Sequence, residues 1–119
     1  MPVPSVLIVN SSADTREVLS TVLARRGLRT IEAAAPAEGL ELARLHRPSV
    51  IVLDAEVEQS VSDPVAEKLA DAASDDQSRL IVLGKIRGQR PLAGSHVIQK
   101  PYHFAPLIHT IERLAAKAA

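Results

Sequence analysis

Three short apolar runs rich in β-branched residues constrain the fold of this chain more than any other feature. They occupy residues 6–9, 50–53 and 80–83. Unbroken runs of this length are typical of parallel strands that are buried on both faces of a sheet. Two further segments, residues 28–34 and 97–98, are apolar but either alternate with polar residues or are very short. We therefore expect them to form the two edge strands.

Segments with helical periodicity alternate with these strands. The first has an apolar stripe made of Val18, Leu19, Val22 and Leu23. Ser12 or Asp14 is placed to cap its start, and Gly27 to end it. Pro36 opens a second helix and Pro64 a third, because proline is favoured at the first helical position. The last helix begins at Phe104, and its apolar residues follow the 3.6-residue period.

The resulting order of elements is β-α-β-α-β-α-β-gap-β-α, which predicts a parallel sheet with right-handed crossovers. The first, third and fourth runs have the character of central strands, which favours the flavodoxin-like strand order 2-1-3-4-5. We therefore expect one α/β domain over residues 1–119. It should be a three-layer sandwich around a five-stranded parallel sheet.

The composition argues against several classes of function. The 14 basic and 14 acidic residues balance, whereas a nucleic-acid-binding domain normally carries a basic surplus. The chain has no cysteine, which excludes a disulfide scaffold and a thiolate metal site. Its apolar runs are far too short to span a membrane. We therefore expect a cytoplasmic protein that binds neither nucleic acid nor membrane.

Polar residues and a glycine stand where the predicted strands end. Asn10 and Ser11 follow the first strand, Asp54 follows the third, Gly84 the fourth, and Lys100 the last. In an open parallel sheet, ligands bind beyond the carboxyl ends of the strands. These five positions therefore form the candidate site. No glycine-rich phosphate loop follows the first strand, so a dinucleotide or flavin-phosphate site is poorly supported.

The sequence around these positions resembles the response-regulator receiver domains of two-component signalling, and the resemblance covers almost the whole chain. It rests on the strand that ends in Asp54, on Lys100 followed by Pro101, and on the spacing from Asp54 to Gly84. The resemblance implies that Asp54 is the phospho-acceptor and that Lys100 contacts the phosphoryl group. It also implies an acidic pair that holds Mg²⁺, a hydroxyl residue that bonds the phosphoryl oxygen, and an aromatic residue that rotates in response.

The chain departs from this pattern at four positions. Asn10 and Ser11 replace the acidic pair, Gly84 replaces the hydroxyl residue, and Val97 replaces the aromatic residue. The site therefore keeps the acceptor and the lysine but loses the groups that bind the metal and relay the signal. We interpret the chain as a degenerate receiver, or pseudo-receiver.

Asp54 and Lys100 alone sum to zero charge, so we expect them to form an ion pair rather than to recruit a cation. Glu56 is a weak further candidate for a metal ligand beside Asp54. We expect no cofactor, and Mg²⁺ only if the site is functional. The interpretation is a non-enzymatic protein-interaction module that is not switched by Mg²⁺-dependent phosphorylation of Asp54. Its partner would be a histidine kinase or a downstream signalling protein.

Three alternatives stay open. The chain could be a functional but inefficient response regulator that accepts phosphate on Asp54 with the help of Lys100. The same two residues could instead be a purely structural ion pair. A small-ligand-binding flavodoxin-like protein is the least favoured, because the rim of the sheet lacks a general base and a phosphate loop.

Receiver domains usually place a helix between the fourth and fifth strands. Here residues 85–95 include Gly88, Pro91 and Gly94, which disfavour a helix of ordinary length. We expect this helix to be short or absent, which would uncover apolar side chains of both strands. An exposed apolar face marks an association site, so we expect that a homodimer could form through it.

Overall fold

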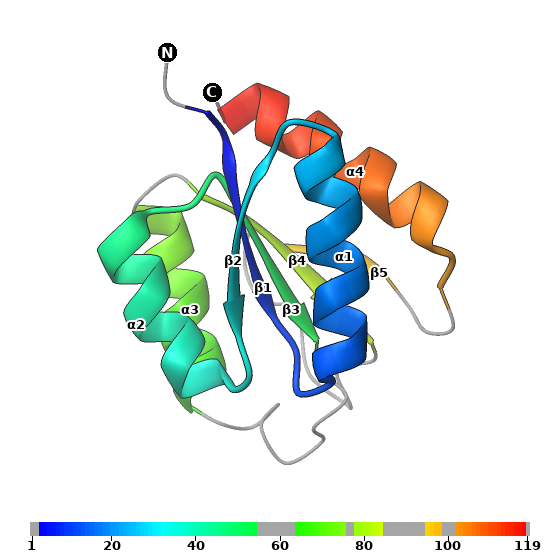
Figure 1. Ribbon diagram of the computed structural model, residues 1–119. Helices are drawn as coiled ribbons and strands as arrows, with labels where there is room; N and C mark the ends of the chain where they lie inside the picture. Colours follow the sequence, from blue (N-terminus) through cyan, green and yellow to red (C-terminus); the bar gives the residue numbers. More distant parts are fainter. Residues whose placement is uncertain (1–2, 55–63, 76–77, 85–94, 99–101, 119) are drawn as a thin grey trace.

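A five-stranded parallel sheet lies between two layers of helices in this chain (Figure 1). The computed structural model describes residues 3–54, 64–75, 78–84, 95–98 and 102–118. The strands are β1 (Ser5–Val9), β2 (Arg29–Ala33), β3 (Val50–Asp54), β4 (Arg79–Leu83) and β5 (Ser95–Ile98). Their order in the sheet is β2-β1-β3-β4-β5, and every pair of neighbours is parallel. The predicted fold class and strand order are confirmed.

Helices cover both faces of this sheet. They are α1 (Ala13–Arg25), α2 (Pro36–His46), α3 (Pro64–Asp75) and α4 (Phe104–Ala118). The pair α1 and α4 packs on one face, and the pair α2 and α3 packs on the other (Figure 1). Helices α2 and α3 begin at the predicted prolines, because the proline ring presets the backbone for a first helical turn. No helix in the described ranges has the length and apolarity that crossing a bilayer requires.

Both faces of the central strands are buried, which explains why their sequences are apolar without interruption. The face under α1 and α4 buries Val6, Ile8, Val50, Val52, Ile81 and Leu83. The face under α2 and α3 buries Leu7, Val9, Ile51, Leu53, Leu80 and Val82. A polar side chain at either set of positions would lose its water without gaining a partner.

The boundaries of α1 follow from local chemistry. The Ser12 side chain accepts a hydrogen bond from the backbone N–H of Thr15 at 3.2 Å, which caps the start of the helix. At the other end, Gly27 adopts a φ of +83°, a conformation that costs glycine little. The N–H of Leu28 then donates to the carbonyl of Leu23 at 3.1 Å, which closes the helix as a Schellman motif.

The predicted apolar stripe of α1 is wrong at one position, Val18. Leu19 and Leu23 are fully buried and Val22 is partly buried, but Val18 is 45% exposed. The helix therefore packs on the sheet through Leu19 and Leu23. Each residue is turned by about 100° from the one before it, so Val18 lies beside the buried stripe and faces solvent.

Helix α2 lies close to β1 because it carries a glycine where the two elements meet. A methyl group added at Gly39 would lie 2.7 Å from Cγ2 of Val9, which is far closer than carbon atoms normally pack. One turn later Ala43, another small residue, is also buried against the sheet. These small residues let α2 approach the strands, and α3 packs alongside it (Figure 1).

The expectation that the apolar side chains of the fourth strand are uncovered is wrong. Leu80 and Val82 of β4 are 2% and 0% exposed, because they belong to one cluster with Leu69 and Ala73 of α3. On β5, Val97 is 39% exposed. The short or absent helix expected at residues 85–95 falls largely on residues 85–94, outside the described part of the chain. The homodimer through this face stays a prediction.

Replacing Ser12 by Ala should lower the free energy of unfolding by about 1 kcal/mol, because the Thr15 N–H loses its capping partner at the start of α1. Urea denaturation followed by far-UV circular dichroism measures the change. The matched control is Ser11→Ala, since Ser11 is exposed and caps nothing. Equal loss of stability in the two variants would contradict the assignment of the cap.

Candidate functional site

The carboxyl ends of β1, β3 and β4 meet at one edge of the sheet and carry the described part of the candidate site. Asn10 follows β1, Asp54 ends β3, and Gly84 follows β4. Strands β1 and β4 pair with opposite edges of β3, so Asn10 and Gly84 flank Asp54. Lys100 and Glu56 lie outside the described residues. The predicted Asp54–Lys100 ion pair therefore stays a prediction.

Asn10 is a buried polar side chain that links two strands at this edge. It is 5% exposed, and its Nδ2 donates to Oδ2 of Asp54 at 2.9 Å. Its Oδ1 accepts from the backbone N–H of Ser12 at 2.8 Å. A backbone N–H can only donate, so the amide oxygen must face Ser12 and the amide nitrogen must face Asp54. The amide nitrogen of Asn10 thus donates a hydrogen bond to Asp54, the candidate phospho-acceptor.

Arg16 of α1 holds the same loop from another direction. Its Nη1 donates to the backbone carbonyl of Asn10 at 2.5 Å, and its Nε lies 3.4 Å from Oε1 of Glu32 on β2. The Nε is buried and not aligned for a hydrogen bond, so its contact with Glu32 is an ion pair only. Nothing in the sequence pattern predicts this role. A lone arginine in a first helical turn carries no signal that it will reach back to the preceding strand.

Among the described residues, the side chain that contacts Asp54 is a hydrogen-bond donor and not a further carboxylate. Mg²⁺ is held by carboxylate, water and phosphate oxygens, whereas Asn10 presents an N–H to Asp54 and engages its own oxygen with Ser12. Ser11 is exposed and offers only a neutral hydroxyl. Among the described residues, no three acidic or histidine side chains gather in a way that could hold a metal ion.

Gly84 stands where the resemblance implies a residue with a hydroxyl group. It differs from such a residue in its backbone conformation as well as in its missing side chain. Its φ is +115°, a conformation that residues with a Cβ rarely adopt. Its N–H donates to the carbonyl of Ile98 at 2.8 Å, which joins the end of β4 to β5. The sequence showed only that the hydroxyl is missing. The structure adds that this strand end is shaped for glycine.

Val97, an aliphatic residue, stands where the resemblance implies an aromatic residue that rotates on phosphorylation. The aromatic residues of the described chain come later in the sequence. Val97 pairs with Val82 in the sheet and is 39% exposed. Tyr102 packs against the core cluster under α1 and α4 and meets Phe104 edge to face, with ring centroids 5.9 Å apart. Tyr102 thus packs on the core at the start of α4, whereas Phe104 is 43% exposed.

Known proteins share the fold of this chain, although no family model and no curated protein matches its sequence. The receiver domain of the Francisella response regulator 1452 aligns over 98% of this chain and 99% of its own, with 19% identity and a TM-score of 0.77. The beryllofluoride-activated NtrC receiver domain aligns over 98% of both chains, with 17% identity and a TM-score of 0.77. The Vibrio cholerae chemotaxis protein CheY4 covers 95% of this chain and 99% of its own, with 22% identity and a TM-score of 0.69. The chain therefore has the CheY-like, flavodoxin-like fold.

Changing Asn10 to Asp should destabilise the protein and create a response to Mg²⁺. The substitution removes the donor at Asp54 and puts a second negative charge beside it, so the loss should exceed the roughly 1–3 kcal/mol expected for Asn10→Ala. Millimolar Mg²⁺ should then raise the melting temperature of Asn10→Asp, because the metal binds the folded state. Asn10→Ala is the matched control and should not respond. A melting temperature of Asn10→Asp that is indifferent to Mg²⁺ would contradict this account of the site.

Placing a hydroxyl residue at position 84 should not repair the site. Gly84→Ser should lower the free energy of unfolding by about 1–3 kcal/mol, because a positive φ strains any residue with a Cβ. Gly84→Ala serves as the control, since it adds the Cβ without the hydroxyl. Chemical denaturation should show similar losses for both variants. A neutral or stabilising Gly84→Ser would mean that the backbone here adapts freely.

Proposed function

We propose that this chain is a receiver-like signalling module of the cytoplasm that works through contacts with other proteins. In this proposal, Mg²⁺-dependent phosphorylation of Asp54 does not switch it. The observation that carries the proposal is the hydrogen bond from Asn10 to Asp54. An uncharged donor stands beside the carboxylate at a position where the resemblance implies an acidic residue.

The electrostatics of the described site support this proposal. A phosphoryl donor is strongly anionic, and it is repelled by a carboxylate unless a cation neutralises the charge. Asn10 and Ser11 bring no negative charge that would attract Mg²⁺ to Asp54. Attack on phosphorus through Oδ2 of Asp54 would also require the Asn10 hydrogen bond to break or rearrange, which adds to the barrier of that route.

The groups that would report phosphorylation are also altered. A hydroxyl that follows the new phosphoryl oxygen has no counterpart at Gly84, whose positive φ disfavours a replacement. The aromatic side chain expected on the last strand has its counterpart in Val97, which has no ring to rotate. A phosphoryl group on Asp54 would therefore lack the two elements that convert it into a change of shape.

The same contacts suit a module with one stable conformation. Asn10 ties β1 to β3, and Arg16 ties the loop after β1 to α1 and to Glu32 on β2. A partner would then recognise a constant surface rather than one that depends on phosphate. The shared fold makes a histidine kinase or a downstream signalling protein the natural class of partner, and the proposal assigns the chain no catalytic residue.

One alternative function keeps a specific observation in its favour. Asp54 is only partly buried, so a small phosphoryl donor can reach it. In that alternative the chain is an inefficient response regulator in which Asp54 accepts the phosphoryl group and Lys100 stabilises it. Acetyl phosphate would then label the protein, and Asp54→Asn would abolish the label.

Titration with beryllofluoride and millimolar Mg²⁺, followed by ¹H–¹⁵N NMR, tests the proposal. Beryllofluoride forms a phosphoryl-like adduct on a competent aspartate, and that adduct needs the metal. The wild-type chain should show no saturable shifts. The control is Asn10→Asp/Ser11→Asp, which restores both carboxylates of the acidic pair and should gain shifts around Asp54. Saturable and widespread shifts in the wild-type chain, or acetyl-phosphate labelling lost in Asp54→Asn, would overturn the proposal in favour of the alternative.

A further inference from the structure

Strand β2 forms one edge of the sheet, between α1 and α2 (Figure 1). In a parallel strand the N–H and the C=O of one residue point to the same side, and this side alternates from residue to residue. The N–H of Arg29 and the carbonyl of Ala33 are bonded to residues that flank β1, at 2.9 and 3.0 Å. The backbone groups of Thr30 and Glu32 therefore point outward, away from the sheet.

The open stretch of this edge is bounded at both ends. Oε1 of Glu38 on α2 accepts a hydrogen bond from the N–H of Ala34 at 2.8 Å, and the turn that closes α1 holds the N–H of Leu28. Among the described residues, nothing outside the sheet bonds to the N–H or C=O of Thr30 or Glu32. Four backbone groups thus stay open, and such an edge can pair with another strand.

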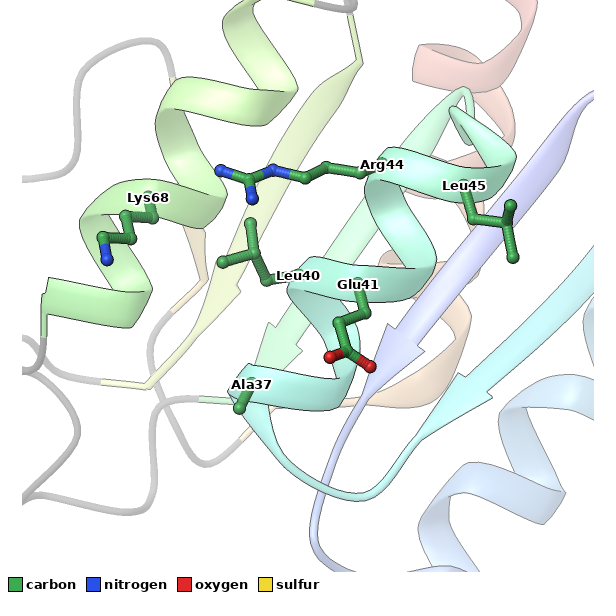
Figure 2. Close-up of a pocket in the computed structure, with 6 residues that line it drawn as sticks. All are labelled: Ala37, Leu40, Glu41, Arg44, Leu45 and Lys68. Carbon is green, nitrogen blue, oxygen red and sulfur yellow. The ribbon is translucent and has the colours of Figure 1, made fainter.

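Helix α2 places apolar side chains beside this edge. Glu38, Leu42 and Leu45 share one side of the helix because of their spacing, and the contact of Glu38 with the end of β2 turns that side toward the strand. Leu42 and Ile31 are partly buried against the cluster under α2 and α3, and Leu45 is 74% exposed. Figure 2 shows the Leu45 side chain pointing away from α3. Apolar surface therefore lies next to the open backbone groups.

Helix α1 flanks the other face of the edge with small residues. Nε of Arg16 lies 3.4 Å from Glu32, which turns this side of α1 toward β2 and balances the charge of Glu32. One and two turns later, the same side carries Ser20 and Ala24. Glu17 is exposed at the outer rim of this flank. Small side chains near the middle of the flank leave room for a second helix to approach.

We propose that β2 pairs antiparallel with β2 of a second copy of this chain, so that the two sheets become one. The two-fold axis would pass beside Ile31. Thr30 of each copy then stands opposite Glu32 of the other, and each such pair exchanges two hydrogen bonds. All four open groups of each strand are used. The two Ile31 residues meet across the axis, with their Cα atoms about 4.5 Å apart.

The bonds already present at the edge select this register over its two neighbours. An axis beside Thr30 would pair Glu32 with Leu28, whose N–H is already bonded. An axis beside Glu32 would place two carboxylates directly opposite each other, which destabilises paired strands. It would also pair Thr30 with Ala34, whose N–H is held by Glu38. The edge is thus complementary to itself, which favours a second copy over an unrelated strand.

The charges along the edge also suit the two-fold arrangement. Arg29 of one copy would lie opposite Ala33 of the other, beside the Glu38 carboxylate at the end of that strand. Glu41 follows on α2 and adds negative charge to the same rim. Arg29 forms no ion pair with the part of the chain that the structure describes, so a second copy brings it acidic partners. The proposal does not depend on whether Asp54 accepts phosphate, and the two can fail separately.

Cysteine cross-linking reads the register directly, because the chain has no cysteine of its own. In Ile31→Cys the two Cα atoms would lie about 4.5 Å apart, within the reach of a disulfide. Mild oxidation of the full chain should therefore give a covalent dimer. The matched control is Thr30→Cys, whose Cα atoms would lie roughly 7–8 Å apart on the diagonal and should not cross-link. Both positions are partly buried, and circular dichroism checks the fold. Equal cross-linking of the two variants would overturn the proposal.

Sedimentation velocity up to millimolar concentration measures the association itself. The wild-type chain should pass from monomer to dimer and form nothing larger, because a two-fold contact closes on itself. Thr30→Pro removes an outward N–H that the single chain leaves unbonded, and proline is tolerated at such edge positions. It should weaken the dimer at least about tenfold, since each copy loses one hydrogen bond. Thr30→Val keeps the N–H and should dimerise like the wild type.

The opposite edge of the sheet supplies a second control. Val97→Ser removes an exposed apolar side chain on β5 and should leave the dimer unchanged. The proposal fails if the wild-type chain stays monomeric at millimolar concentration, or if Thr30→Pro dimerises as well as the wild type. It also fails if Val97→Ser abolishes the dimer, because that result would assign the contact to β5.

Discussion

Burial of the central strands on both faces is the constraint from which the rest of this structure follows. A sheet that must be covered twice needs helices on two layers, and parallel strands need a crossover for each new strand. All strands then point the same way, so their carboxyl ends meet at one edge. Asn10 and Asp54, which are 44 residues apart in the sequence, become hydrogen-bonded neighbours there.

At that edge the uncharged amide of Asn10 donates a hydrogen bond to the carboxylate that the resemblance would give to a metal ion. A hydrogen bond to a charged group contributes about 1.5–3 kcal/mol, and it does so without a metal or a phosphoryl donor. The backbone of Gly84 fits the same interpretation, since its positive φ makes a hydroxyl residue unfavourable beside Asp54. The contacts of Arg16 with Asn10 and Glu32 extend this arrangement to α1 and β2. The described residues of the site are therefore joined to β1, β2, β3 and α1 by hydrogen bonds and an ion pair.

The two layers of helices also leave two outer surfaces that face in opposite directions. Each exposes one large apolar side chain, Val18 on α1 and Leu45 on α2. Exposed apolar residues are common on any surface when they are isolated.

The sequence by itself determined the features that depend on neighbouring residues. The apolar runs predicted the strands, Pro36 and Pro64 marked helix starts, Gly27 marked a helix end, and the strand-end positions located Asn10, Asp54 and Gly84. Only the tertiary structure decided which atom of Asn10 faces Asp54, that Arg16 reaches back to β1, that α3 covers β4, and that Val18 faces solvent. The physical reason is range. Strand, cap and turn preferences act over a few residues, whereas burial and side-chain pairing depend on segments that the fold brings together from distant parts of the chain.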